Sequence, residues 1–409
     1  MELLDKKILK IHNYIYANDG LSNSETLNEF LKIFYCKIID EKQDNLLLKC
    51  NSENDVIDTI NELYGCLKEC LKNFIDSKEK INLKKDTICF IVEELKNIKF
   101  DSISSDTKGH ILQKIIDRSY RESRGQFFTP CQVVDFIVKM IEPKRNEIGC
   151  DPASGTGGFM FSALEYISQN KNIDQKDLKN VYFYDISKSL IKLIAMRMMF
   201  EFSNAESNFF VKDSISEDFN IQFDYILTNP PFGTQGKITS SNILDKYDLS
   251  YDGKKRLSSQ VPDILFVEKV IKLLKENGRA AVVLPDGDFE NPSQEYFRKY
   301  LLDNVKIDAI VSLPDGTFIP YGTGVKSSII FFTKLNYNNL QKLITRNYDI
   351  FYGKITKLGY TFSKHSKDIL NKDGTIDEDY TKVLEAFKSK KYDDDNYLVD
   401  VNTIINNKY

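Results

Sequence analysis

The sequence contains no apolar run that approaches the roughly 20 consecutive residues needed to cross a lipid bilayer. Its first residues, Met1–Asp5, include acidic side chains where a secretory signal would be basic. The sequence therefore predicts a protein without a membrane segment, located in the cytoplasm.

Cysteine and histidine are scarce and scattered. The seven cysteines form an odd set, which argues against a disulfide framework. Cys66 and Cys70 are four residues apart, but both fall on apolar positions of a helical pattern. The three histidines, His12, His110 and His365, lie far apart in the chain. The sequence therefore predicts no metal site.

An excess of positive charge is also missing. Lys and Arg number 56 against 60 Asp and Glu, which gives a formal net charge of −4. A protein that grips DNA alone usually has a basic surface, because phosphate contacts dominate affinity. Either one face of the protein is basic although the net charge is negative, or a partner supplies much of any affinity for nucleic acid.

The 409 residues are too many for one compact core, so two or three domains are expected. Residues 1–118 have apolar side chains at three- and four-residue steps, which predicts helices at Leu3–Ile15, Thr26–Ile39 and Val56–Ile75. The polar cluster Asn51–Asp55 offers N-cap residues for the last of them. This region forms either a helical docking domain or a structural cap.

In residues 119–360, short apolar runs alternate with helical stretches. This alternation predicts an α/β domain with a doubly wound, mostly parallel, Rossmann-like sheet. Ligands of such sheets bind at the carboxyl ends of strands, near the point where strand order reverses. The expected strands are Glu147–Cys150, Val181–Tyr184, Tyr225–Thr228, Ala280–Leu284, Ala309–Leu313 and Ser328–Phe332.

Two other stretches are polar. Residues 233–260 are rich in Gly, Ser and Lys, and we expect them to form a long loop. Residues 361–409 are charged and polar, which predicts a solvated or partner-ordered C-terminal extension.

A glycine-rich segment, Asp151-Pro152-Ala153-Ser154-Gly155-Thr156-Gly157-Gly158-Phe159, follows the first expected strand and opens a helix. Glycine lets the backbone turn tightly and approach a ligand. The segment lacks the regular spacing of a dinucleotide loop, and Pro152 has no N–H to offer a pyrophosphate. These features favour a nucleoside cofactor without phosphate, which S-adenosylmethionine satisfies.

Acidic residues follow the next expected strand and the short apolar run after it. Asp185 ends the run Val181–Tyr184, where a carboxylate can accept hydrogen bonds from ribose hydroxyls. Asp213 follows the run Phe209–Val211, where a carboxylate can meet an exocyclic adenine amine. Acidic residues that follow successive strands in order indicate a cofactor site more specifically than any one of them alone.

The tetrad Asn229-Pro230-Pro231-Phe232 follows the strand that ends near Thr228. Its prolines make a rigid loop without backbone donors. The Asn229 side-chain oxygen and the Pro230 carbonyl would accept hydrogen bonds from an exocyclic NH₂ group and draw its nitrogen toward tetrahedral geometry. Phe232 would stack on a base that has left the duplex.

Together these segments resemble the modification subunit of type I restriction–modification systems, within the N6-adenine DNA methylase family. The resemblance covers roughly residues 100–360, and it includes Gln126-Phe127-Phe128-Thr129-Pro130 before the cofactor loop and Asp263–Phe266 after the tetrad. It departs at Asp185, where many relatives have Glu. The implied cofactor-binding residues are Gln126, Phe127, Phe128, Thr129, Pro130, Asp151, Ala153, Ser154, Gly155, Gly157, Asp185, Asp213, Asn229 and Phe266.

The resemblance implies site-specific methylation of adenine N6 in double-stranded DNA. It also implies a separate specificity subunit, because the polar end of the chain leaves no room for a recognition domain. A second copy of the chain and a restriction nuclease subunit are further candidate partners. Three alternatives stay open: an RNA methyltransferase, a protein-glutamine methyltransferase, and a catalytically silent scaffold with the same fold.

Overall fold

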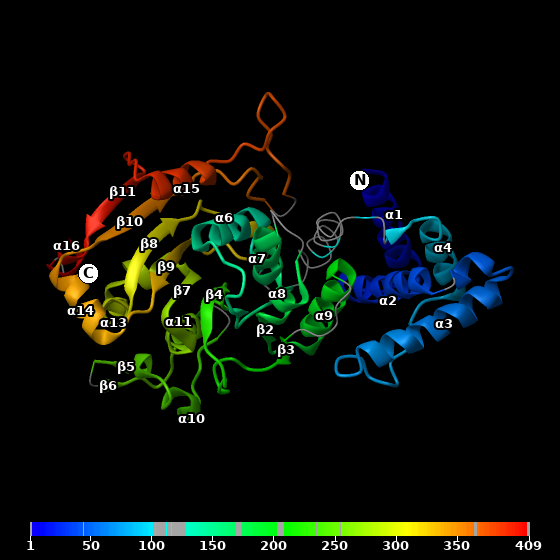
Figure 1. Cartoon of the computed structure of the whole chain (residues 1–409), viewed down its shortest axis with the longest axis horizontal. Helices are drawn as coiled ribbons and strands as arrows, with labels where there is room; N and C mark the ends of the chain where they lie inside the picture. The colour runs from blue at the N-terminus through cyan, green and yellow to red at the C-terminus, as the bar shows by residue number, and fades with distance from the viewer. Residues whose placement is uncertain are drawn as a thin grey trace. The chain divides into compact units, whose positions relative to one another are not determined.

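The computed structural model describes residues 2–43, 45–100, 103, 112, 116, 128–168, 173–202, 208–233, 236–253, 255–363 and 366–406. The chain divides into two compact units (Figure 1). The helical unit comprises residues 1–126 and 188–207, and the sheet unit comprises residues 127–187 and 208–409. The expected boundary near residue 118 falls outside the described residues.

The helical unit is built from amphipathic helices. Expected helices at its start are confirmed, and capping boxes at Ser22 and Ser52 define where the second and third of them begin. Apolar residues of these helices form a core that also includes Phe100, whose ring meets that of Phe34 edge to face with centroids 4.7 Å apart. The elements are α1 (Glu2–Asp19), α2 (Asn23–Lys42), η1 (Leu46–Lys49), α3 (Glu53–Cys70), α4 (Lys85–Leu95) and α9 (Lys188–Phe202).

Helix α9 belongs to the helical unit, although in the chain it connects two strands of the sheet. Most of its side chains are buried, including Arg197 and Glu201, which form an ion pair at 2.5 Å. Phe200 packs edge to face on Phe34 at 4.7 Å. The expected division into contiguous domains therefore differs from the structure, because a helix that is apolar on all sides has no sequence mark of which unit it joins.

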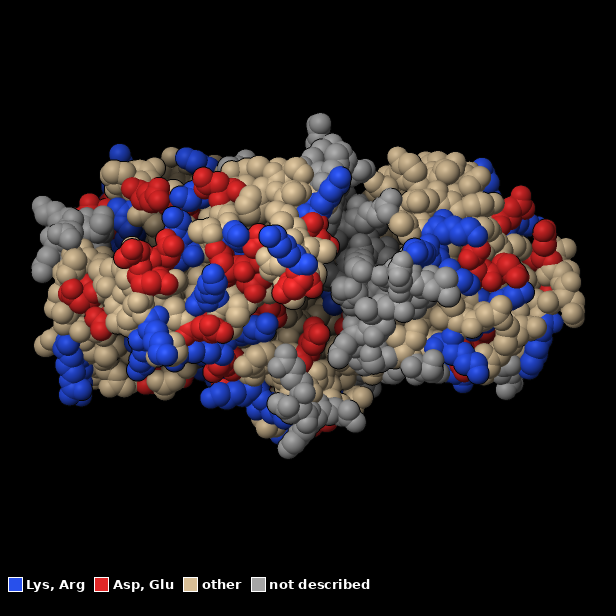
Figure 2. All heavy atoms as spheres, turned by 90° about the horizontal axis from the view of Figure 1, so that it is seen from above, with Lys and Arg blue, Asp and Glu red and all other residues tan. Residues whose placement is uncertain are grey.

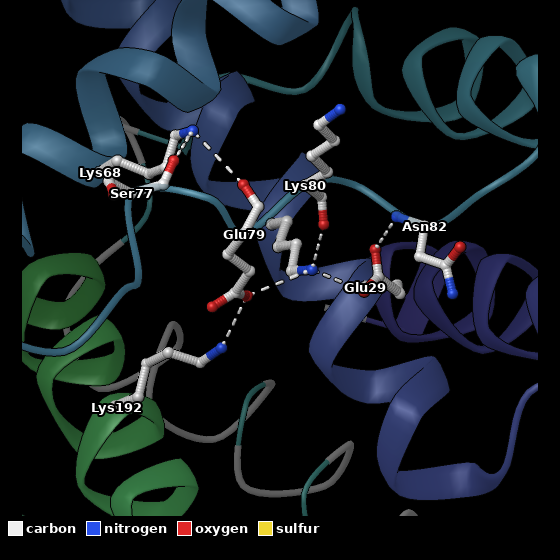
Figure 3. Close-up of polar contacts among 8 residues, drawn as sticks. Glu29, Lys68, Ser77, Glu79, Lys80, Asn82 and Lys192 are labelled. Carbon is white, nitrogen blue, oxygen red and sulfur yellow. Dashed lines mark hydrogen bonds and ion pairs between the residues drawn. The ribbon is translucent and has the colours of Figure 1, made fainter.

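A buried ion network joins three segments of the helical unit (Figure 3). Lys32 of α2 is 3% exposed and donates to the carboxylate of Glu29 at 2.6 Å. Glu79, in the segment between α3 and α4, forms ion pairs with Lys32 at 3.2 Å and with Lys192 of α9 at 3.0 Å. The network satisfies charges that burial would otherwise leave without partners.

A nine-stranded sheet forms the centre of the sheet unit, in the order β11-β10-β8-β9-β7-β4-β1-β2-β3. Strands β9 and β11 run antiparallel to their neighbours, and the other pairings are parallel. The strands are β1 (Gly149–Asp151), β2 (Val181–Asp185), β3 (Asn208–Val211), β4 (Phe223–Thr228), β7 (Leu274–Pro285), β8 (Lys306–Ser312), β9 (Ser327–Thr333), β10 (Asp349–Lys354) and β11 (Asn396–Asp400). The predicted doubly wound, mostly parallel α/β sheet is confirmed, as is every strand expected from the sequence.

Helices cover both faces of this sheet: α6, α7 and α15 lie on one face, and α11, α13 and α14 on the other (Figure 1). Because both faces are covered, central strands such as Phe223–Thr228 and Ser327–Thr333 are almost continuously buried. The helices are α6 (Cys131–Ile141), α7 (Gly158–Ser168), α8 (Gln175–Lys179), α10 (Ser241–Leu244), α11 (Pro262–Leu273), α12 (Asp286–Glu290), α13 (Glu295–Asn304), α14 (Tyr337–Thr345), α15 (Tyr380–Ser389) and α16 (Val401–Asn406), with η4 (Asp248–Ser250), η5 (Pro292–Gln294) and η6 (Ile319–Tyr321).

The segment from 233 to 260, expected to be a long loop, contains short elements. Its described part includes the helices α10 and η4 and the hairpin of β5 (Tyr251–Asp252) and β6 (Lys255–Arg256). Arg256 forms an ion pair with Asp245 at 2.7 Å. Local pairing of this kind gives the segment a defined path.

The end of the chain is part of the sheet and is not a separate extension as the sequence suggested. Strand β11 pairs antiparallel with β10, and Tyr397 stacks on Tyr352 with ring centroids 5.7 Å apart. Helix α15 packs on these strands through Phe387, which lies against Phe351 at 5.3 Å. The polar sequence concealed this, because an edge strand is held by backbone hydrogen bonds and needs few apolar residues.

No helix in the described part of the chain is long and apolar enough to span a membrane.

Candidate active site

The residues expected to form the site follow the carboxyl ends of four adjacent parallel strands. Asp151 ends β1, Asp185 ends β2, Asp213 lies just after β3, and Asn229 directly follows β4. These strands are neighbours in the order β4-β1-β2-β3, so their carboxyl ends share one edge of the sheet. Strand order reverses between β1 and β4, which is the position where open α/β sheets bind ligands.

The cofactor loop turns from β1 into α7 through two glycines in left-handed conformations. Gly155 has φ +53° and Gly157 has φ +83°. A Cβ atom at Gly157 would lie 2.9 Å from the ring of Phe161 and 3.1 Å from that of Phe183. Glycine is therefore required at Gly157 by both conformation and space.

Asp151 fixes the inner side of this loop. It is 1% exposed, and its Oδ1 accepts the Ala153 N–H at 3.0 Å. The Ser154 hydroxyl donates to the Asp151 carbonyl at 2.8 Å, and the Ser154 N–H donates to the Tyr184 carbonyl at 2.9 Å. Burial raises the pKa of Asp151 to about 7. The side chain thus stabilises the loop from within the protein.

Asp185 links the cofactor loop to the turn after β2. Its Oδ2 accepts the Gly155 N–H at 2.9 Å, and its Oδ1 accepts the Ser187 N–H at 2.8 Å. Burial raises its pKa, while these two N–H groups act in the opposite direction. Each carboxylate oxygen can accept a further hydrogen bond, and the residue is only partly buried. The carboxylate of Asp185 can therefore still accept hydrogen bonds from hydroxyl groups of a ligand.

Ile186 is a candidate site residue that the sequence reasoning missed. It follows Asp185, and 75% of its surface is exposed. The available signal was an apolar residue directly after a strand-ending acid. An exposed apolar side chain here offers a surface on which a flat ring can lie.

Asp213 and its neighbours form the next part of the edge. Its Oδ1 accepts the Ile215 N–H at 3.0 Å, which shapes the turn after β3. The Ser214 hydroxyl donates to the Pro152 carbonyl at 2.6 Å and so joins this turn to the cofactor loop. Asp213 itself is half-buried beside that junction.

The side chain of Asn229 is oriented by Thr129. Its Nδ2 donates to the Thr129 Oγ1 at 3.0 Å. Its Oδ1 is buried, and no described residue donates a hydrogen bond to it. Since a buried acceptor is costly to leave without a donor, this oxygen is a ready acceptor for a group that enters the site.

The ring of Phe232 is not exposed in the way that stacking on a base requires. It is 1% exposed and meets Phe318 edge to face, with ring centroids 6.0 Å apart. Pro230 is buried and Pro231 half-buried. The next residue, Gly233, donates its N–H to the Asp263 Oδ2 at 3.2 Å. Stacking of Phe232 on a base therefore stays a prediction, and it requires a movement of the ring.

The other expected residues divide into three groups. Gln126 and Phe127 lie outside the described residues. Phe128 is buried, and Pro130 is the N-cap of α6. Phe266 is 6% exposed and belongs to the apolar core around α11. Within the described ranges, no cluster of three or more His, Cys, Asp or Glu side chains is arranged to hold a metal ion.

Comparison of the sequence with known proteins gives consistent matches. The model of the family described as N-6 DNA methylase matches residues 103–409. The methylase subunit of the type I restriction enzyme EcoEI from Escherichia coli is 31% identical over 257 residues, which are 60% of this chain and 50% of that protein. The StySPI methylase subunit from Salmonella potsdam is 29% identical over 253 residues, 56% of this chain and 45% of that protein. The chain spans about half the length of the curated relatives it matches.

Comparison of the structure gives the same fold. The methyltransferase subunit of a type I restriction–modification system from Streptococcus thermophilus superposes with a TM-score of 0.73 at 19% identity. The superposition covers 100% of this chain and 97% of that one. The likeness extends over the helical N-terminal part as well as the sheet.

Proposed function

The chain belongs to the N-6 DNA methylase family, and we propose that it transfers a methyl group from S-adenosylmethionine to the N6 amine of adenine in DNA. The observation that carries this proposal is the amide of Asn229, whose nitrogen is occupied by Thr129 while its buried oxygen has no donor among the described residues. An amide held this way presents an acceptor to an NH₂ group.

A site with hydrogen-bond acceptors for an NH₂ group suits the chemistry of adenine N6. The lone pair of this nitrogen is delocalised into the ring, so the free amine is a poor nucleophile. Hydrogen bonds from its two N–H groups to the Asn229 Oδ1 and the Pro230 carbonyl would draw the nitrogen toward tetrahedral geometry and localise the lone pair. The nitrogen would then form a bond to the methyl carbon while the bond from that carbon to the sulfonium sulfur breaks. S-adenosylhomocysteine would leave with the electron pair, and the nitrogen would lose one proton to water, which leaves N6-methyladenine.

The loop after β1 and the acid after β2 fit the proposed cofactor. When bound, S-adenosylmethionine supplies an electrophilic methyl group on a sulfonium. The glycine turn at Gly155 and Gly157 allows close approach of a ligand to the backbone, and Asp185 retains acceptor capacity for ribose hydroxyls. Ile186 offers an apolar surface for the adenine ring. Asp213 would accept a hydrogen bond from the adenine amine of the cofactor.

Access to adenine N6 in a duplex requires that the base leave the stack. The Asn229 amide is part-buried beyond the end of β4, so only an extrahelical base would reach it. Phe232 would then have to turn away from Phe318 to contact the base.

Sequence recognition is proposed to come from a separate specificity subunit. The two relatives reported above are named as methylase subunits of type I restriction enzymes. The formal net charge of −4 gives little general attraction to DNA phosphates. On the face in Figure 2, basic and acidic side chains of the described residues are interspersed. A partner that contacts DNA would supply the missing affinity.

Substitution of Asn229 by alanine tests the catalytic assignment. We expect Asn229→Ala to abolish genomic N6-methyladenine in long-read maps of the source strain, while S-adenosylmethionine affinity measured by calorimetry stays nearly native. Asn339→Ala, at an exposed position of α14, is the matched control and should preserve both. Equal loss of methylation and cofactor binding in Asn229→Ala would reject the assignment.

The purified chain tests the partner assignment. Without a specificity subunit, we expect it to methylate a defined DNA sequence poorly. Efficient methylation of one defined sequence by the chain alone would show that no recognition partner is needed.

A further inference from the structure

The main chain of the catalytic tetrad contains two residues that cannot donate hydrogen bonds. Pro230 and Pro231 have no N–H, so they cannot tie the chain to its surroundings in this way. The position of the Pro230 carbonyl, which is proposed above to accept a hydrogen bond from adenine N6, therefore depends on what holds the chain on either side of the prolines. We call residues 229–233 the catalytic loop.

Before the prolines, the catalytic loop is held by the sheet. Strand β4 lies between β1 and β7, and Thr228 at its end is paired with Val282 of β7. The side chain of Asn229 then donates to the hydroxyl oxygen of Thr129 at 3.0 Å. Strand pairing and one side-chain contact thus fix the start of the loop.

After the prolines, the catalytic loop is held by Asp263, near the start of α11. The Oδ2 of Asp263 accepts the Gly233 N–H at 3.2 Å, and its Oδ1 accepts the Ile264 N–H at 3.2 Å. The residue is 2% exposed, and a buried carboxylate is costly unless it has hydrogen-bond donors. A helix N-terminus also favours negative charge. The Gly233 N–H therefore has a charged acceptor whose place is determined by α11.

Glycine at position 233 allows this close approach. A Cβ atom there would lie 2.5 Å from a methyl carbon of Val261, the residue before α11. A larger residue would push the loop away from the start of the helix, and the N–H would no longer reach the carboxylate. The contact between Gly233 and Asp263 is thus supported by packing as well as by the hydrogen bond.

A second buried carboxylate of α11 makes the same kind of contact with a different segment. Glu268 is 0% exposed, and its two oxygens accept the N–H groups of Asp248 and Leu249 at 2.9 and 2.8 Å. It also pairs with Lys272 at 2.6 Å. Helix α11 therefore holds two parts of the chain: Asp263 holds the catalytic loop, and Glu268 holds the segment around η4.

We propose that Asp263 is a positioning residue: its carboxylate holds the Gly233 N–H and thereby keeps the Pro230 carbonyl in place for the amine. The inference rests on the proposed methyl transfer, because that reaction gives the carbonyl its role. Phe232 would have to turn away from Phe318 to contact a base. The hold on Gly233, the next residue, would then keep the main chain of the loop from following the ring.

Substitutions in α11 separate this role from general stability. Asp263→Ala removes the acceptor, so single-turnover methyl transfer at saturating S-adenosylmethionine should slow about tenfold or more, as for a lost hydrogen bond to a charged group. Asp263→Asn keeps an oxygen for Gly233 and should restore much of the rate. Glu268→Ala also removes a buried contact of α11, but away from the catalytic loop, and it should keep the native rate.

The rates are compared in the complex with the specificity subunit. A native rate in Asp263→Ala would overturn the proposal. If Glu268→Ala were as slow as Asp263→Ala, or if Asp263→Asn were no faster than Asp263→Ala, loss of stability would explain the rates and the positioning role would be rejected.

Hydrogen exchange tests the contact without any activity. Labelling with ¹⁵N-glycine lets NMR follow the Gly233 N–H in the free chain. This N–H should exchange at least about tenfold faster in Asp263→Ala than in the native chain or in Glu268→Ala. Equal exchange in the native chain and Asp263→Ala would overturn the anchor, whatever the reaction. If exchange differs as expected but the native complex methylates no DNA, the anchor stands and the proposed function fails.

Discussion

The Nδ2 of Asn229 donates to the Oγ1 of Thr129 at 3.0 Å, across one hundred residues of sequence. Thr129 lies just before α6, and Asn229 lies just after β4. Because an amide nitrogen can only donate, this contact determines which end of the side chain remains to accept a hydrogen bond. A residue expected to contact the cofactor thus orients the group proposed to bind the amine.

Thr129→Val tests this orientation. Valine has nearly the shape of threonine but no oxygen, so the Asn229 amide would lose its partner and turn more freely. With saturating S-adenosylmethionine, we expect kcat to fall about fivefold to tenfold, as for one lost hydrogen bond. Single-turnover methyl transfer with saturating cofactor measures the effect. Thr129→Ser keeps the hydroxyl and should restore most of the rate; a serine variant as slow as the valine variant would contradict the orienting role.

Asp185→Ala tests the cofactor end of the site. The substitution removes an acceptor from the proposed ribose contact and also releases the N–H groups of Gly155 and Ser187. We expect cofactor affinity to weaken by about 1–3 kcal/mol, measured by calorimetry. Asp303→Ala, which removes an exposed carboxylate in α13, should leave affinity unchanged. Unchanged affinity in Asp185→Ala would refute the ribose assignment.

The sequence was sufficient to place Asp151, Asp185, Asp213 and Asn229 at one edge of the sheet. Each follows a short apolar run, and parallel strands bring their carboxyl ends together. This deduction needs only local patterns and the rule for strand direction. The glycine turn after β1 was predictable for the same reason, because left-handed backbone favours glycine locally.

Partnerships between distant side chains were not predictable. Nothing near Thr129 in the sequence marks its contact with Asn229, since the contact depends on how α6 packs beside the end of β4. The placement of α9 in the helical unit was missed because both of its faces are apolar. Strand β11 was missed because backbone pairing holds its polar sequence in place.

Asp151 makes the stability of the fold depend on pH. Its ordinary pKa of 3.8 is raised by burial to about 7 in the folded chain, so the folded state binds this proton more tightly than the unfolded state. The free energy of unfolding should therefore decrease as pH rises from about 4 to about 7. Asp151→Asn cannot ionise, and its oxygen can still accept the Ala153 N–H. We expect the variant to lose less stability than the native chain between about pH 5 and pH 8, in urea unfolding. Parallel curves for the two proteins would contradict the assignment.

Lys32 tests the ion network of the helical unit (Figure 3). The side chain of Lys32 is buried. Its ammonium group contacts Glu29 at 2.6 Å, Glu79 at 3.2 Å and the Lys80 carbonyl at 2.8 Å. Lys32→Met would leave the Glu29 carboxylate buried without a cation. We expect the free energy of unfolding to fall by about 3–5 kcal/mol, measured by denaturant unfolding.

Two further lysine variants show whether burial causes the loss. Lys192→Met should have a smaller effect, because Glu79 is more exposed and keeps its ion pair with Lys32. Lys299→Met breaks an ion pair whose two side chains are both more than half exposed, and it should change stability by less than about 1 kcal/mol. If Lys32→Met and Lys299→Met destabilised the protein equally, the charge of Lys32 would have no special role in holding α2 to the segment before α4. We therefore expect Lys32→Met to destabilise the protein most, Lys192→Met less and Lys299→Met least. This order follows the burial of each ion pair, because water can solvate the remaining carboxylate only where that carboxylate is exposed.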